Sequence, residues 1–382
     1  MVIYLPHSSK YAFILDESAY ATGKVVNNEK WIIKNNLLGA PDFCPVVLKT
    51  KTIQAAMDFD ISKSLLMFQK KYNASVHRRA FNYLYTKETK SSFEIEREKP
   101  SQNKMERFVL LLTKAGIEND TLFLLESALT DKQNKIVDAR FIAHGWRDFQ
   151  NYIGETLPDY AQLVHYVCPP PSAVKPMMMG LNDCFQRSKD NNAIIVATLI
   201  AFGFVFIHPF DDGNGRLHRY LIHDILVRKK AVSSGTIIPI SAQMLENIEL
   251  YDRILEAYSK PLLSFLKFSL DAQGELTIEN PTEVVPYFKY PNLTLQCEYI
   301  FNSLVAAINK IENELEYLRK YDLLKNEVEN YLDLPDKLFN NLIIFIHQNN
   351  GVLSKSKRKQ FEKLTDSEIN KIEKGYRQIF FK

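Results

Sequence analysis

The stretch from His208 to Arg219, HPFDDGNGRLHR, holds the side chains of this sequence that are best suited to catalysis or ligand binding. Backbone N–H groups in a glycine-rich turn, followed by a helix N-terminus, form a binding site for anions. Arg216 and Arg219 are three residues apart, so they share one helix face and can form paired hydrogen bonds with phosphate oxygens. Asp212 is suited to hold a Mg²⁺ that bridges two phosphates, and a neutral His208 can accept a proton near pH 7. The pattern predicts a polyphosphate site with a base beside it.

The neighbouring segments explain how such a loop is positioned. Residues 194–207 are almost all apolar, and the run is longer than an ordinary strand, which predicts a buried helix too short to span a bilayer. Pro209 ends this helix, and Gly213 and Gly215 allow backbone conformations that other residues resist. The alternative is a histidine that ends a core helix and a polar turn that caps the next one. That alternative does not explain two arginines at helical spacing.

These residues resemble the signature of the Fic domain proteins, HxFx(D/E)GNGRxxR, with every defining position filled. The resemblance implies a protein adenylyltransferase, which moves AMP from ATP to a Ser, Thr or Tyr hydroxyl of a target protein or of itself. It implies His208 as the catalytic base and Asp212 as the ligand of Mg²⁺. The ATP contacts that it implies come from Gly213, Asn214, Gly215, Arg216 and Arg219.

A second resemblance lies upstream, in the stretch KETKSSFEIEREKP that begins at Lys87. Ser92 and Glu96 are four residues apart and would lie on one face of a helix. Fic proteins of the self-inhibited type have an [S/T]xxxE(G/N) helix whose Glu pairs with the second arginine of the signature, which implies that Glu96 pairs with Arg219 and weakens ATP binding. The departure is Arg97, where the family usually has Gly or Asn. A solvated Glu in a charged helix face remains the alternative.

Three further segments are placed by the resemblance. A β-favouring run before three prolines predicts an extended ribbon, and relatives have a β-hairpin flap there that docks the target by its backbone. The flap role is assigned to Leu163, Val164, His165, Tyr166 and Val167, with a proline-stiffened linker as the alternative. Tyr251 is expected to stack on adenine, with a core tyrosine as the alternative. Arg147 is expected to form an internal ion pair.

Composition narrows the class of protein without identifying a partner. A net charge of +3 and 46% hydrophobic residues describe an ordinary globular protein, which does not favour a nucleic-acid partner. Cys44, Cys168, Cys184 and Cys297 include no CxxC pair, so a reducing cytoplasm fits best. Neither a signal peptide nor a membrane-spanning run is recognised.

The chain is long enough for two or three units. We expect a mainly α protein: a small irregular N-terminal lobe with a helical layer over residues 1–105, a Fic-type helical bundle core with the flap over 106–270, and a C-terminal helical region over 271–382. The period of residues 298–318 predicts a long amphipathic helix that packs within the chain or against a second copy, so a homo-oligomer is one possible state.

Two other functions stay open on the sequence. Some relatives transfer other phosphate-containing groups, and a Glu at the inhibitory position can instead position water to remove AMP. A protein of another class would use the same site to sense nucleotide in a helical interaction protein without turnover. The choice of AMP as the transferred group rests on the resemblance.

Overall fold

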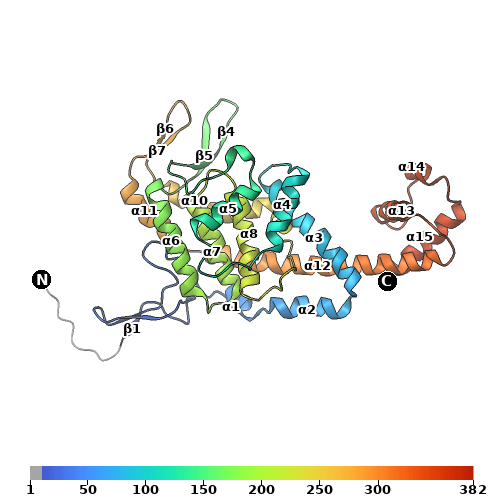
Figure 1. Cartoon of the computed structure of the whole chain (residues 1–382), viewed down its shortest axis with the longest axis horizontal. Coiled ribbons are helices and arrows are strands. Elements are labelled where there is room, and N and C mark those ends of the chain that lie inside the picture. The colour runs from blue at the N-terminus through green and yellow to red at the C-terminus, as the bar shows by residue number, and fades with distance from the viewer. Residues whose placement is uncertain (1–10, 382) are drawn as a thin grey trace. The chain divides into compact units, whose positions relative to one another are not determined.

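The computed structural model describes residues 11–381, and most of them are helical (Figure 1). The described chain forms two compact units. One contains the described residues up to 65 together with 83–308, and the other contains 66–82 together with the residues from 309 onward. The two domain boundaries that the sequence predicts, near residues 105 and 270, both fall inside the first unit, and they remain predictions. Within the described range, every helix falls short of the length and apolar character needed to cross a membrane.

The N-terminal lobe is a small sheet with irregular connections. Strands β1 (Ala12–Phe13) and β2 (Val26–Asn28) flank β3 (Ile33–Asn35), with β1 parallel and β2 antiparallel to it. The short strands and the long turns between them fit the β-favouring runs and breaks of this part of the sequence.

Helices follow the sheet up to a hairpin. They are α1 (Lys51–Asp58), α2 (Ile61–Lys71), α3 (Ala74–Ile95), α4 (Gln102–Thr113), α5 (Glu126–Ile136) and the 3-10 turn η1 (Ala139–Phe141). The helix α3 carries Ser92 near its end. Helices α1 to α3 lie within residues 1–105, where the sequence predicts a helical layer.

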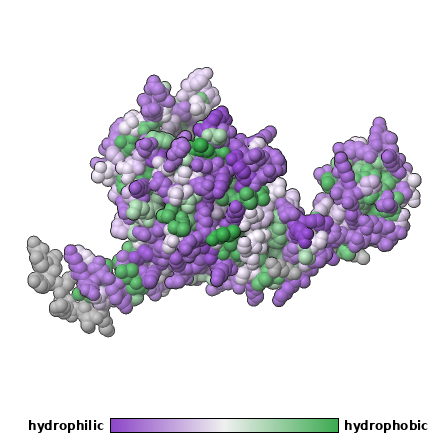
Figure 2. Space-filling model, in the orientation of Figure 1, coloured by the Kyte–Doolittle hydropathy of each residue, from purple (hydrophilic) through white to green (hydrophobic). Residues whose placement is uncertain are grey.

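The centre of the first unit is α7 (Ala193–Ile207), which packs between α6 (Pro171–Ser188) and α8 (Asn214–Arg228). Residues 194–207 are buried on every side, as the apolar run predicts, and Asn192 caps the helix by accepting a hydrogen bond from the Ile194 amide at 2.8 Å. Polar side chains cover most of the face shown in Figure 2. A helix fixed by apolar contacts all round gives a rigid base for the loop that follows it.

The predicted flap is a β-hairpin, in which β4 (Tyr152–Thr156) pairs with β5 (Gln162–Val167) in antiparallel register. A bulge between Ile153 and Gly154 shifts the register. The inner end of β5 is buried at Tyr166 and Val167, whereas Leu163 at the outer end is 43% exposed. The proline-stiffened linker, the alternative for this segment, is thus excluded as a description of its structure.

The rest of the first unit covers the other side of α7. It contains α9 (Ile240–Glu246), α10 (Ile248–Leu263), a second hairpin of β6 (Phe268–Leu270) and β7 (Leu276–Ile278), α11 (Pro281–Lys289) and the beginning of α12 (Thr294–Glu329). The long amphipathic helix predicted from residue 298 is α12, and Leu304, Ile308 and Ile311 on its apolar stripe are buried.

The second unit has its own apolar core. The end of α12 joins α13 (Asp336–Gln348), α14 (Lys355–Arg358), the 3-10 turn η2 (Lys359–Phe361) and α15 (Asp366–Phe380) around buried side chains such as Leu324, Leu342 and Ile372. Thr365 and Glu368 form a capping box at the start of α15. The mainly α fold with small strand pairs is confirmed.

Candidate active site

The loop between α7 and α8 is closed by its own side chains. His208 ends α7 in a left-handed conformation, with φ of 52°, and Gly213 turns the chain into α8 with φ of 89°. The Asn214 side chain accepts a hydrogen bond from the Phe210 amide at 3.1 Å and donates one to the Phe210 carbonyl at 2.8 Å. This pair of bonds fixes the turn that leads into the N-terminus of α8, where the first backbone amides have no partner within the helix.

The His208 ring has the properties of a general base. Its Nδ1 lies 3.3 Å from the Val205 carbonyl oxygen, so Nδ1–H donates to that oxygen and Nε2 is left as the basic nitrogen. Burial, and next the positive charge of Arg147, lower the pKa of His208 to about 4. The ring is therefore neutral across physiological pH and ready to accept a proton.

Arg147 holds the chain around His208, and the expectation of an internal ion pair is wrong. Its guanidinium donates to the carbonyl oxygens of His208 at 2.8 Å, Phe149 at 2.8 Å and Pro169 at 2.7 Å. Its own amide donates to the Pro209 carbonyl at 2.9 Å. The side chain is 6% exposed and ties together the hairpin, the approach to α6 and the end of α7.

Arg219, the second arginine of the motif, is bound by the end of α3. It is 1% exposed, and its Nη2 donates to Glu96 Oε1 at 2.7 Å and to the Ser92 carbonyl at 2.7 Å, while Nε donates to Ser92 Oγ at 2.9 Å. Glu96 also lies against the turn: a Cβ built on Gly215 would be only 2.1 Å from Glu96 Oε1. The Glu96 carboxylate thus lies against Gly215 and Arg219, within the segment where the sequence predicts a phosphate.

The departure at Arg97 does not disrupt the helix end. Arg97 adopts the left-handed conformation, with φ of 56°, and the Glu98 amide donates to the Phe93 carbonyl at 3.1 Å. This closing pattern is typical of a helix C-terminus, where Gly or Asn is usually found because neither suffers much strain there. The chain accepts a strained residue at this point, and the hydrogen bonds of the turn are still formed.

Arg216, the first motif arginine, is held by three groups. It is 3% exposed, and its guanidinium donates to Asp212 Oδ1 at 2.5 Å, to Glu98 Oε2 at 2.8 Å and to the Ile136 carbonyl at 3.0 Å. Asp212 also accepts from the Gly213 amide at 2.6 Å. The two bonds that Asp212 accepts from described residues both use Oδ1, so this partly exposed carboxylate can still offer its second oxygen to a cation.

The residues present fit a Mg²⁺ bound mainly by substrate. Within the described residues, no group of three His, Cys, Asp or Glu side chains is placed to hold a metal ion alone. Magnesium in phosphate-transfer sites is often held by one or two carboxylates together with the phosphates themselves. Asp212 beside the glycine turn would provide such a carboxylate.

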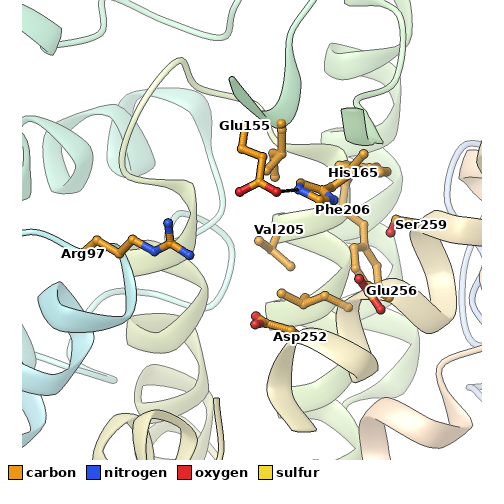
Figure 3. A pocket seen from close by; sticks show the side chains of 12 residues that line it. Arg97, Glu155, His165, Val205, Phe206, Asp252, Glu256 and Ser259 are labelled. Atoms are coloured by element: carbon orange, nitrogen blue, oxygen red, sulfur yellow. Dashed lines mark hydrogen bonds and ion pairs between the residues drawn. The ribbon is translucent and has the colours of Figure 1, made fainter. Parts of the chain in front are cut away.

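A cavity of about 350 Å³ lies between the hairpin, α7 and α10 (Figure 3). Val205 and Phe206, in the last turn of α7 before His208, form part of its wall. The hairpin contributes His165 and Tyr166 to the lining among others, so two of the five predicted flap residues border this cavity. Arg97 lines it from the end of α3 (Figure 3).

Tyr251 is placed differently from the expectation. Its ring is 3% exposed and stacks between His218 and Tyr299, with ring centroids 6.3 and 6.0 Å away, and it is not among the described residues that line the cavity. The contact with adenine therefore stays a prediction, and the core position is what the structure shows. The lining from α10 consists instead of Asp252, Leu255, Glu256 and Ser259. Their spacing on one helix face was a signal in the sequence that could have identified them.

The motif segment is similar to a known family domain. Residues 117–226 match the Fic/DOC family model. This range includes the hairpin, His208 and both motif arginines, whereas Ser92 and Glu96 precede it. None of the curated proteins compared with the chain matches it.

Two solved structures are similar to the chain. One is a Fic family protein from Desulfovibrio desulfuricans G20, with 15% sequence identity, a TM-score of 0.47, and coverage of 85% of this chain and 84% of that one. The other is a Fic domain containing signaling protein from Bacteroides thetaiotaomicron VPI-5482, with 15% identity, a TM-score of 0.42, and coverage of 67% of this chain and 97% of that one. Both TM-scores are below 0.5, so the function is inferred from the family match and the site itself.

Proposed function

We propose that this protein is a transferase of the Fic type, and specifically a protein adenylyltransferase that moves AMP from ATP to a Ser, Thr or Tyr hydroxyl of a target protein or of itself. The family match over residues 117–226 supports the coarser function, since Fic domain proteins are typically transferases. The observation that carries the proposal is the Glu96 carboxylate, an anion that pairs with Arg219 and lies against Gly215 near the N-terminus of α8, in the segment that follows a neutral histidine. A site that holds a carboxylate in this way is suited to hold phosphate.

His208 begins the reaction. Its Nε2 takes the proton of the target hydroxyl as that oxygen attacks the α-phosphorus of ATP, so that a new O–P bond forms and the bond to the β-phosphate oxygen breaks. Pyrophosphate leaves, and the proton on His208 can pass to it. The lowered pKa of His208 keeps the ring neutral before attack.

The glycine turn and the arginines hold the phosphates. The Gly215 amide and the N-terminus of α8 stabilise charge on the phosphoryl oxygens, and Arg219 takes the outer phosphates once Glu96 has moved away. Arg216 keeps Asp212 in place, as their 2.5 Å contact suggests, and Asn214 keeps the turn closed. A bound Mg²⁺ would neutralise phosphate charge and favour departure of pyrophosphate.

The cavity beside the hairpin is the proposed place for the nucleoside. It is bordered by an apolar wall from α7 and polar side chains from α10, which is the composition of many ligand pockets. The hairpin would dock the target by adding a strand, which uses backbone groups and so tolerates many target sequences. A protein target, the protein itself included, is thus the expected partner.

Glu96 restrains this activity in the proposal. A guanidinium that already binds a carboxylate cannot bind the outer phosphate in the same geometry, so ATP must displace Glu96 before transfer. The alternatives remain transfer of another phosphate-containing group, removal of AMP with Glu96 positioning water, and nucleotide sensing without turnover.

Labelled ATP distinguishes these functions. The wild type, Glu96→Gly and His208→Ala are each incubated with Mg²⁺ and with ATP labelled at either the α- or the γ-phosphate. We expect Glu96→Gly to increase label from the α position on itself or on lysate proteins. His208→Ala should abolish this label, both alone and combined with Glu96→Gly. Label from the γ position alone would indicate phosphate transfer. Tight ATP binding with no label from either position would indicate nucleotide sensing.

A further inference from the structure

A second carboxylate of the same segment binds the first motif arginine. Glu98 Oε2 accepts a hydrogen bond from Arg216 Nη1 at 2.8 Å, and Glu98 Oε1 accepts one from Lys104 of α4. The Arg216 side chain is 3% exposed and that of Glu98 is 29% exposed. Two residues of one short segment, Glu96 and Glu98, therefore each bind one of the two motif arginines.

The backbone of this segment explains how both carboxylates reach α8. The helix α3 ends at Ile95, and the left-handed conformation of Arg97 turns the chain sharply between the two glutamates. Arg216 and Arg219 are three residues apart and present their guanidinium groups on one face of α8. The turn at Arg97 thus sets Glu96 on one arginine and Glu98 on the next.

Loss of the Glu98 carboxylate would affect Arg216 less than it would affect the segment of residues 96–98. Arg216 retains Asp212 and the Ile136 carbonyl as partners when Glu98 is absent, so its charge would stay compensated and the fold should tolerate the loss. Besides the backbone bonds of the turn, the segment is held by the pair of Glu96 with Arg219 and by Glu98, which contacts both α4 and α8. The effect of Glu98 is therefore expected mainly on the position of residues 96–98.

We propose that Glu98 is a second restraining carboxylate. It holds the segment of residues 96–98 on α8 through Arg216 and so keeps Glu96 against Arg219 and Gly215. This inference rests on the proposed function of the site. A change at Glu96 alone then releases the site only in part, because residues 96–98 stay beside it, and full release requires the loss of both ion pairs.

A binding measurement on four forms of the full chain tests this role. The wild type, Glu96→Gln, Glu98→Gln and the double variant are titrated calorimetrically with ATP and Mg²⁺. The amide variants keep the shape of the side chains and remove their charge. We expect each single variant to bind ATP a few-fold more tightly, and the double variant to bind it at least tenfold more tightly than the better single variant.

Glu94→Gln is the matched control. Glu94 lies in the last turn of α3 and forms an exposed ion pair with Lys90 at 3.5 Å, so it changes the same charge without touching α8. This control should bind ATP like the wild type. Hydrogen exchange of the amides at residues 96–98 is measured in parallel, and Glu98→Gln should raise their exchange rate several-fold, whereas Glu94→Gln should not.

Two results would overturn the inference. One is a Glu98→Gln variant that binds ATP like the wild type and adds nothing in the double variant. The other is weaker ATP binding, which would mean that Glu98 positions Arg216 for the nucleotide instead of restraining the site. Because binding and exchange do not depend on turnover, both readouts remain decisive if the transfer assays on Glu96→Gly show no label and the proposed function fails.

Discussion

Two buried arginines of the candidate site, Arg147 and Arg219, are stabilised in different ways. Arg147 donates to backbone carbonyls from three separate parts of the chain. Arg219 binds the side chain of Glu96 together with Ser92. Carbonyl groups of a folded backbone cannot leave without unfolding it, whereas the carboxylate of Glu96 is 37% exposed and can be exchanged for another anion.

This difference distinguishes an arginine that holds the fold together from one that is placed to bind a ligand. A guanidinium that is compensated by backbone dipoles needs no counter-ion and stays in place as long as the backbone stays folded. A guanidinium that is compensated by a partly exposed carboxylate can bind a phosphate in place of that carboxylate. The partner of a buried arginine, and not its burial, therefore indicates which of the two roles it has.

The largest effect is expected from Arg147→Ala. This change leaves several buried carbonyl oxygens without a donor, so we expect the free energy of unfolding to fall by on the order of 3 kcal/mol and transfer to be lost. Urea unfolding measures the first effect. Arg140→Ala is the control, because Arg140 is 80% exposed in its pair with Asp138, and it should leave the midpoint unchanged. Equal stability of the two variants would contradict a scaffold role for Arg147.

The next effect concerns pH. Burial, and the Arg147 charge second, lower the pKa of His208 to about 4, and burial lowers that of His218 to about 3. An unfolded histidine titrates near 6.5, so below that pH the unfolded state binds more protons and stability falls. The free energy of unfolding should decrease by about 2 kcal/mol from pH 6.5 to 5.5 for the two histidines together. His208→Gln should remove about half of this decrease, and an unchanged slope would show that other groups cause it.

A smaller effect on stability is expected from Glu96→Gln. The carboxylate is more than a third exposed, and Arg219 keeps both bonds to Ser92, so the free energy of unfolding should change by less than about 1 kcal/mol. The same variant should bind ATP more tightly. A loss of stability as large as that of Arg147→Ala would remove the distinction between the two arginines.

The smallest effect is expected from Arg97→Gly. Glycine relieves the strain of the left-handed conformation but gains freedom in the unfolded chain, and these contributions oppose each other. We expect the free energy of unfolding to stay within about 0.5 kcal/mol of the wild type. Thermal unfolding checks this, and a clear loss of stability would show that the Arg97 side chain itself holds the segment to its surroundings.

Local features of the site follow from short stretches of sequence. The buried helix of residues 194–207, the turn at Gly213, the strand of residues 163–167 and the long helix α12 were all predicted. The pairing of Glu96 with Arg219 was expected from the resemblance, and the two side chains lie 2.7 Å apart in the structure. The roles in ATP binding, metal binding and target docking stay predictions.

Other features depend on packing between distant segments. The carbonyl partners of Arg147 and the contact of Glu98 with Arg216 were not recognised in the sequence, and the core position of Tyr251 was only the alternative to a contact with adenine. The Glu98 contact joins residues 118 positions apart. No periodicity or turn preference in a sequence specifies which of many charged side chains will pair when they lie so far apart along the chain.

The sequence by itself determined the rigid apolar helix, the glycine turn after it and the spacing of the two arginines, because hydrophobic period and backbone preference act over a few residues. The tertiary structure decided which group compensates each buried charge. That choice depends on how the end of α3, α4 and α8 meet, where a charged side chain takes whichever partner the fold brings within hydrogen-bond distance.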